Sequence, residues 1–419
     1  MLIQYCGLMK KVDYILFVLR NTKIVSEIKS VRIKEMNRLV LFSIFDDEGI
    51  VDEYVYYLLQ ELQSVASKVV VIINGKITSS SWESLQEYAV QVIQRENIGF
   101  DAGAYKDILF NHIGIDNVKK YDELILCNDT FYGPFVHLKE IWKSFEAKNI
   151  DFWGLHFWQA GYLNWISSFF LVFRKRILLD DRFYEYWNQN IDVACKDIKL
   201  VYATFETGLF YELCEMGYRY DTYAEKGDYH IMLCPDYAIN KFNVPFIKKK
   251  AFTNRFFYPE NIYKALSYVA AKKDYDIDLI CKSVSRKYGC IVNKDILNKK
   301  KCISEEHKIL SADYAAKDLL SLKEFCNTWH KETIYIFGAG IVASKIYFLL
   351  RKSIKNFGGF IVSNVDNEKV LFGQPIIDSN NISLGSECII IGLNPENSDE
   401  IRSKMPETKK IFYIWEKVV

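Results

Sequence analysis

Two stretches of the sequence decide the fold, ENIGFDAGAYK at residues 96–106 and YDELILCNDTFYGP at residues 121–134. The second contains the run 123–127, which is typical of a buried strand and ends on Asn128 and Asp129. Ligands of open α/β sheets bind just beyond the carboxyl ends of the strands. A carboxylate there can hold a hard cation, and the cation can hold a diphosphate. The pattern therefore predicts a ligand site at Asn128 and Asp129.

The neighbouring sequence predicts the sheet that would carry this site. Further strand patterns occupy residues 39–45, 69–73 and 90–93, and helical patterns lie between them. Strands that alternate with helices indicate a largely parallel sheet covered on both faces. Asp46, Asp47 and Asn74 follow the first two strands and are predicted nucleotide contacts. The alternative is ordinary turn chemistry, which also favours Asp and Asn.

Four motifs in this order resemble the rhamnan synthesis F family, glycosyltransferases that assemble rhamnose-rich cell-surface polysaccharides. They are the two stretches above, DFWGL at residues 151–155 and FETGL at residues 205–209. The resemblance covers roughly residues 36–255 and implies an α/β, GT-A-like fold with a mostly parallel sheet. The patterns along the rest of the sequence divide the chain into a helical lead-in (residues 1–37), a transferase domain (38–255), a helical connector (256–330) and a Rossmann-like domain (331–419).

The resemblance implies an inverting rhamnosyltransferase. The donor would be a nucleoside diphosphate sugar, dTDP- or GDP-rhamnose, and the acceptor a cell-surface polysaccharide or a lipid-linked glycan. Mg²⁺ or Mn²⁺ held by Asp129 would bind the diphosphate, and other glycan-assembly enzymes would be partners. Only one carboxylate is present at Asn128-Asp129, which leaves an alternative open: a nucleotide-sugar-binding or scaffolding protein without turnover.

Residue roles also follow from the resemblance. Glu206 is the expected catalytic base and Asp151 the second candidate, with helix-end or turn roles as alternatives. Asp101 is expected to bind donor hydroxyls or, alternatively, to cap a helix. The remaining donor-binding candidates, beside Asp46, Asp47 and Asn74, are Asn97, Gly99, Gly103, Asn128 and Lys248.

Aromatic side chains are dense between residues 150 and 165. Aromatic faces stack on the C–H surfaces of sugars, so Trp158 and Trp165 are candidates for an acceptor platform. A core built from large rings is the alternative, and it is the favoured interpretation for Trp153.

The C-terminal part carries GAGIVA at residues 338–343, between a strand pattern and a helix pattern. Glycines in such a turn aim backbone amides at a phosphate, so Gly338 and Gly340 are candidate phosphate-binding residues. A purely structural turn is the alternative. Ser363-Asn364 stands where a nicotinamide site needs an acid, which argues against an oxidoreductase.

Composition excludes further classes of protein. A net charge of +1 argues against nucleic-acid binding, and ten cysteines without metal-like spacing suggest a reducing compartment. No apolar run approaches the ~18–20 residues of a membrane span. We therefore expect a cytoplasmic protein, with peripheral contact at the inner face of the cell membrane as a further expectation.

Overall fold

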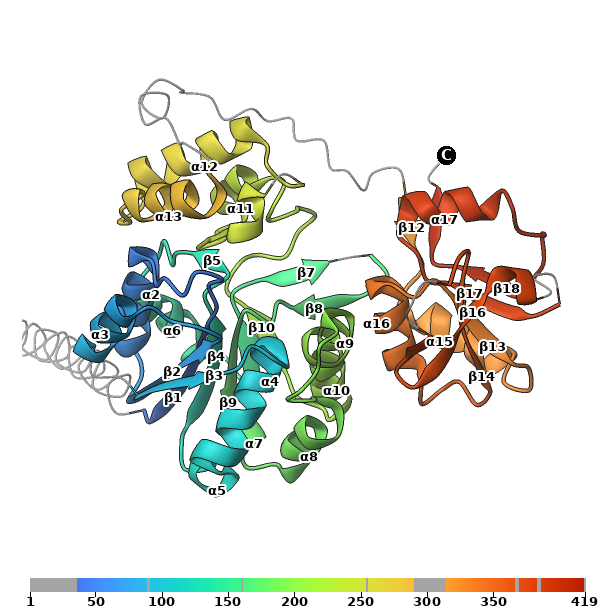
Figure 1. The fold of residues 1–419 in the computed structure, drawn as a ribbon, viewed down its shortest axis with the longest axis horizontal. Coiled ribbons are helices and arrows are strands. Elements are labelled where there is room, and N and C mark those ends of the chain that lie inside the picture. The colour runs from blue at the N-terminus through green and yellow to red at the C-terminus, as the bar shows by residue number, and fades with distance from the viewer. Residues whose placement is uncertain are drawn as a thin grey trace, which may run out of the picture.

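The computed structural model describes residues 36–88, 91–159, 161–253, 255–289, 314–365, 369–382 and 386–417. Most of the expected helical lead-in, residues 1–35, lies outside these ranges. The described chain forms two α/β units that lie side by side (Figure 1).

The first unit is built on a seven-stranded sheet with the order β10-β6-β9-β4-β1-β2-β3. All neighbours pair in parallel except β9, which is antiparallel to β4 and to β6. The fold is therefore α/β and GT-A-like with a mostly parallel sheet, as predicted. Its strands are β1 (Arg38–Ile44), β2 (Lys68–Asn74), β3 (Gln91–Arg95), β4 (Glu123–Asn128), β6 (Phe152–Gly154), β9 (Phe170–Arg174) and β10 (Tyr220–Thr222).

Helices bury both faces of this sheet, which explains why its central strands are apolar throughout. Along β1, Leu39 and Leu41 pack into one core and Val40 and Phe42 into the other. The first core includes α4 (Phe100–Asp107), the π-helix η1 (Ile108–Ile113), α5 (Ile115–Val118), α7 (Lys175–Leu178), α8 (Asp181–Asn190), α9 (Ile198–Val201), the π-helix η2 (Tyr202–Gly208) and α10 (Leu209–Glu215). The second includes α2 (Glu53–Gln63), α3 (Ser79–Glu87), α6 (Leu138–Phe145) and α11 (Pro235–Phe242).

Short elements complete the edge at which the strands end. β5 (Phe131–Tyr132) pairs with β11 (Ile247–Lys248), which leads into the 3-10 turn η3 (Lys249–Phe252). β7 (Phe157–Gln159) and β8 (Asn164–Ile166) form an antiparallel hairpin. α12 (Pro259–Lys272) and α13 (Asp278–Tyr288) follow as the helical connector and pack on the second core.

The second unit has a six-stranded sheet with the order β15-β16-β14-β13-β17-β18. Its strands are β13 (Ile334–Phe337), β14 (Phe357–Val362), β15 (Val370–Leu371), β16 (Gln374–Asp378), β17 (Cys388–Ile391) and β18 (Ile411–Tyr413). Its helical elements are α15 (Leu319–Thr328), α16 (Ile341–Leu350), the 3-10 turn η4 (Ser379–Asn381) and α17 (Pro395–Arg402).

One strand corrects the expectation of a purely helical connector up to residue 330. β12 (Tyr314–Ala316) pairs antiparallel with β19 (Trp415–Lys417), so residues 314–316 belong structurally to the C-terminal unit. This strand pair lies against the tip of the β7–β8 hairpin. A Cβ added at Gly161 would lie 2.7 Å from the Cβ of Ala316, and the Tyr162 and Trp415 rings are 5.3 Å apart.

The two units share one continuous apolar core. Phe205 and Leu209 of the first unit and Ile346 and Phe348 of the second belong to the same buried cluster. Gly208 is needed at the contact, because an added Cβ would lie 2.4 Å from the Phe348 ring. Figure 1 shows α16 facing α9 and α10 across this boundary.

Candidate active site

The candidate site begins where β1 and β4 end. Asn128 is the last residue of β4, and its backbone N–H donates to the carbonyl of Phe169 over 3.0 Å. The next backbone N–H, of Asp129, donates to the carbonyl of Ser43 over 3.2 Å. Both side chains are buried. The sheet therefore fixes the two residues that the sequence placed at the strand end.

A chain of polar contacts joins three segments at this edge. The Asn128 amide donates to Asp101 Oδ2 over 2.8 Å, and its oxygen accepts from the Thr130 hydroxyl over 2.6 Å. Lys248 Nζ donates to Thr130 Oγ1 over 2.5 Å. The structure thus brings together three predicted donor-binding residues, Asp101 on α4, Asn128 on β4 and Lys248 on β11.

Burial shifts the pKa of two residues in this series of polar contacts, Asp101 and Lys248. It raises the pKa of Asp101, and the nearby Glu206 carboxylate adds to the rise although the Asn128 hydrogen bond opposes it. Burial, together with the neighbouring Lys250, lowers the pKa of Lys248 to about 7, although the charges of Glu206 and Asp101 oppose the decrease. A group whose pKa lies near neutrality exchanges protons readily, which is common at functional sites.

Asp129, the predicted metal ligand, is already engaged by the protein. Lys249 Nζ lies 2.8 Å from Asp129 Oδ2 and 2.7 Å from the Tyr54 hydroxyl, and that hydroxyl lies 3.2 Å from the same carboxylate oxygen. A divalent cation at Asp129 would be repelled by the Lys249 ammonium. Within the described ranges, no group of three or more His, Cys, Asp or Glu residues could hold a metal ion. In the structure, the predicted ligand of Mg²⁺ or Mn²⁺ is therefore paired with a lysine of the protein itself.

Glu206, the predicted base, lies on η2 and faces the same region. Its Oε1 accepts from the indole N–H of Trp165 over 2.7 Å and lies 3.8 Å from Lys345 Nζ. Its side chain is 19% exposed, so it is reachable from solvent. The charge of Glu206 raises the pKa of both Asp101 and Lys248, so Glu206 belongs to the same electrostatic cluster as these strand-end residues.

Of the three tryptophan candidates, one lies in the core and two lie near the candidate site. Trp153 is fully buried, as expected for a core residue. Trp158 and Trp165 pair across the β7–β8 hairpin with ring centroids 6.1 Å apart. Trp165 is buried against Glu206, whereas Trp158 is only partly buried and stands beside the rings of His156 and His230.

The candidates after β1 and β2 have protein partners. Asp46 lies 2.8 Å from both Arg286 and Lys287 of α13, and Asp47 also pairs with Lys287. Burial by itself would raise the pKa of Asp46, but these two cations outweigh burial and hold it well below its usual range. Asn74 donates to Ser43 Oγ over 2.8 Å and accepts from Arg95 over 2.9 Å.

The glycines of the first stretch face the protein's own backbone. Gly99 has φ +72°, and a Cβ added there would lie 2.4 Å from the carbonyl oxygen of Val193. A Cβ on Gly103 would lie 3.1 Å from the Val193 Cα. Gly99 and Gly103 are therefore packed against the loop before α9. Asn97, two residues before Gly99, is exposed.

Asp151 does not lie with the other candidates. It precedes the first residue of β6, which runs antiparallel to β9 and hence in the direction of β4, so Asp151 lies at the opposite edge of the sheet from Asn128. There it accepts from Arg176 over 2.9 Å and from the backbone N–H of Arg219 over 2.8 Å. This placement removes Asp151 from the candidate catalytic group.

Gly338 and Gly340 lie in the turn between β13 and α16, in the second unit. Gly338 has φ +111°, and an added Cβ would lie 2.8 Å from the carbonyl oxygen of Gly392. Nothing lies within 4 Å of a Cβ added at Gly340, which is the N-cap of α16. Strand packing therefore accounts for the first glycine but not for the second.

Sequence reasoning missed Tyr54, Lys249 and Lys345. The run of lysines at 248–250 was the available signal, but such a run more often belongs to a solvated surface. Lys345 stands in an apolar helix pattern of the C-terminal unit, and no motif connects it with Glu206. Only the packing of the two units against each other brings Lys345 next to Glu206.

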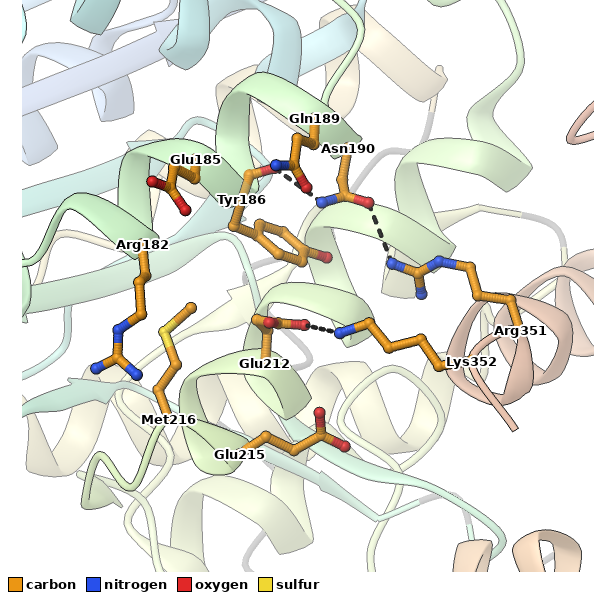
Figure 2. A pocket seen from close by; sticks show the side chains of 10 residues that line it. All are labelled: Arg182, Glu185, Tyr186, Gln189, Asn190, Glu212, Glu215, Met216, Arg351 and Lys352. Atoms are coloured by element: carbon orange, nitrogen blue, oxygen red, sulfur yellow. Dashed lines mark hydrogen bonds and ion pairs between the residues drawn. The ribbon is translucent and has the colours of Figure 1, made fainter. Parts of the chain in front are cut away.

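A separate cavity of about 330 Å³ lies at the boundary between the units (Figure 2). Arg351 and Lys352 reach toward it from the end of α16, where they contact Asn190 over 3.2 Å and Glu212 over 3.3 Å. Its lining mixes acids and bases and contains none of the predicted site residues.

A protein-family model and a curated protein each match part of this chain. The model of a family described as rhamnan synthesis protein F matches residues 69–320. An uncharacterized protein of Sinorhizobium fredii, y4gN, is 26% identical over 155 residues, which are 36% of this chain and 39% of that protein. The chain thus spans about two fifths of the length of this curated relative.

Solved structures with low identity were also found. Glucosyl-3-phosphoglycerate synthase from Mycobacterium tuberculosis, in complex with Mn²⁺, UDP and glucosyl-3-phosphoglycerate, is 8% identical with a TM-score of 0.23; the match covers 34% of this chain and 58% of that one. TarS 1–349 of S. aureus is 11% identical with a TM-score of 0.30, over 76% of this chain and 82% of that one.

Proposed function

Because the chain belongs to the rhamnan synthesis protein F family, we propose that it is a glycosyltransferase that moves a sugar from a nucleoside diphosphate donor to a glycan. The observation that carries the proposal is the convergence of Asp101, Asn128, Lys248 and Glu206 from four elements at one sheet edge. Such an edge is where α/β sheets bind their ligands.

In this proposal the donor diphosphate lies against Lys248 at the end of β11 and Lys249 at the start of η3. Lys248 and Lys249 bring two ammonium groups to Thr130 and Asp129, where a departing diphosphate needs positive charge. Asp101 and Asn128 would bind sugar or ribose hydroxyls. Mg²⁺ or Mn²⁺ stays an untested prediction that the Asp129–Lys249 pair does not favour, and no step is assigned to a metal.

Glu206 is the proposed base. Its Oε2 would take the proton of the acceptor hydroxyl while the hydroxyl oxygen bonds to the anomeric carbon. The bond between that carbon and the diphosphate oxygen breaks, and the nucleoside diphosphate leaves. Displacement in a single step inverts the anomeric centre. Trp158, partly buried beside Trp165, would offer the acceptor sugar a stacking surface.

The finer identity of the reaction is also a proposal. The donor is dTDP- or GDP-rhamnose, the acceptor is a cell-surface polysaccharide or a lipid-linked glycan, and the partners are other glycan-assembly enzymes. A cytoplasmic place at the inner face of the membrane suits such an acceptor. The described residues contain no helix long and apolar enough to cross a membrane. The division into a lead-in (1–37), a transferase domain (38–255), a helical connector from residue 256 and a C-terminal domain is kept as part of this proposal, with the connector ending before β12 instead of at residue 330.

One observation keeps a second candidate function in view. Asp129 is the only carboxylate at the end of β4, and Lys249 neutralises it. A protein that binds a nucleotide sugar within a glycan-assembly complex without turning it over would have the same site.

Donor turnover tests the proposal and separates the two functions. The full chain is incubated with dTDP-rhamnose or GDP-rhamnose and a rhamnan acceptor, with either EDTA or Mn²⁺, and release of the nucleoside diphosphate is measured. Release that disappears in Glu206→Gln supports the transferase. Donor binding without release supports the binding protein, and absence of both refutes the proposed donor class.

A further inference from the structure

Lys345 is a lysine of the second unit that is buried against the first. It lies in the middle of α16 and is only 5% exposed. Burial lowers its pKa, and the charge of Glu206 opposes the decrease. An ammonium group is costly to remove from water unless it finds compensating charge. The contacts of Lys345 therefore indicate what holds it there.

Lys345 contacts Glu206, the proposed base, and Trp165. Lys345 Nζ lies 3.8 Å from Glu206 Oε1 and 3.8 Å from the centroid of the Trp165 ring. The same Trp165 donates its indole N–H to Glu206 Oε1 over 2.7 Å. Lysine, tryptophan and glutamate thus form one triad across the boundary between the units.

The triad is asymmetric at the carboxylate. Trp165 donates to Oε1, the ion-pair contact of Lys345 is to the same Oε1, and Oε2 accepts no hydrogen bond from the described residues. An oxygen fixed from two sides holds the plane of the carboxylate and leaves the other oxygen to accept a proton. Reaction rates depend steeply on such placement, since a shift of ~1 Å can reduce a rate ~10²-fold.

We infer that Lys345 is a positioning residue for Glu206, so that the C-terminal unit completes the group that activates the acceptor. This inference rests on the proposed function, because it assigns Lys345 a role through the proposed base. It also gives the C-terminal unit a task that does not require a nucleotide at Gly338 or Gly340.

Activity of three full-length variants tests the inference. Lys345→Met keeps most of the length of the side chain and removes its charge, Lys345→Arg keeps the charge, and Lys352→Met removes an exposed ion-paired lysine beyond the same helix. For Lys345→Met we expect kcat to fall ~10- to 100-fold with less than ~2-fold change in donor KM. Lys345→Arg should recover part of the loss, and Lys352→Met should match the wild type.

A double-mutant cycle with Glu206→Gln separates positioning from general damage. If Lys345 acts through Glu206, then adding Lys345→Met to Glu206→Gln causes no further loss of kcat. The inference would be overturned if the kcat losses of the two single variants multiply in the double variant. A wild-type kcat in Lys345→Met would overturn it as well. Thermal unfolding of each variant verifies that the compared proteins are folded.

A measurement without substrate keeps the test independent of the proposed function. In a ¹H–¹⁵N spectrum, the indole signal of Trp165 is assigned by its loss in Trp165→Phe. We expect Lys345→Met and Glu206→Gln each to shift this signal, and Lys352→Met to leave it unchanged. An unshifted signal in Lys345→Met refutes the inference. A shifted signal in a chain that turns over no donor supports the triad and refutes the transferase instead.

Discussion

Lys249→Met should weaken diphosphate binding without any change in metal requirement. Lys249 Nζ is 2.8 Å from Asp129 Oδ2, and its side chain is 14% exposed. A hydrogen bond to a charged group contributes about 1.5–3 kcal/mol. Since ~1.4 kcal/mol is tenfold in affinity, the dissociation constant for dTDP should rise ~10- to 150-fold.

The variant has a second effect that must be separated from the first. Removing Lys249 leaves the Asp129 carboxylate buried without its cation, which is destabilising and repels a phosphate. The double variant Lys249→Met/Asp129→Asn removes both charges and should recover stability but not affinity. Lys250→Met is the matched control, because Lys250 is exposed and bonds to Tyr202 rather than to Asp129.

Isothermal titration with dTDP, first in EDTA and then with Mn²⁺, decides the matter. We expect wild-type binding in EDTA, a weaker affinity in Lys249→Met and an unchanged affinity in Lys250→Met. The reasoning is refuted if dTDP binds only when Mn²⁺ is present. It is refuted equally if Lys249→Met binds dTDP as tightly as the wild type does.

Three further predictions concern other parts of the site. Glu206→Gln should keep donor binding by titration and lower turnover ~10²-fold or more; equal losses of both would indicate a structural role. Gly99→Val should lower the free energy of unfolding by more than ~2 kcal/mol, and the melting temperature with it, because φ is +72° and the Val193 carbonyl oxygen is 2.4 Å from the new Cβ. Gly114→Ala, which has φ +83° but an open surrounding, should lose less, and equal losses in calorimetry would count against the clash. Lys248, with a pKa lowered from 10.5 to about 7, binds fewer protons folded than unfolded between those values, so stability gains from it as pH rises through that window. Denaturant unfolding of Lys248→Met should show a smaller increase than the wild type from pH 7 to 10, and identical slopes would exclude the lowered pKa.

The sequence predicted the parts of the site that depend on strand ends. Asn128 and Asp129 could be placed because an apolar run ends on them, and Asp101 because it belongs to the first motif that resembles the family. The ion pairs could not be predicted, since Lys249 and Arg286 reach their acids from 120 and 240 residues away in the sequence. Asp151 was misplaced for a related reason: a carboxylate next to a strand can stand at either end of the sheet.

The same limit applies to the boundary between the units. Hydrophobic patterns indicated two α/β segments, because each has its own alternation of strands and helices. They carry no information on which helix faces touch, so the core shared by η2 and α16 and the position of Lys345 were not accessible. The glycine at 208 is the local trace of that contact, yet a glycine in a helical pattern does not reveal which helix approaches it.

The strand pair β12–β19 has a consequence for genetics. It rests on the tip of the hairpin that carries Trp158 and Trp165, through Ala316 against Gly161 and Trp415 against Tyr162. A substitution at Trp415 lies about 250 residues from Trp165 in the sequence, yet it removes support from the hairpin beneath the proposed acceptor. Alleles that alter the last strand should therefore behave like acceptor-recognition alleles, and second-site suppressors of them are expected within residues 157–166.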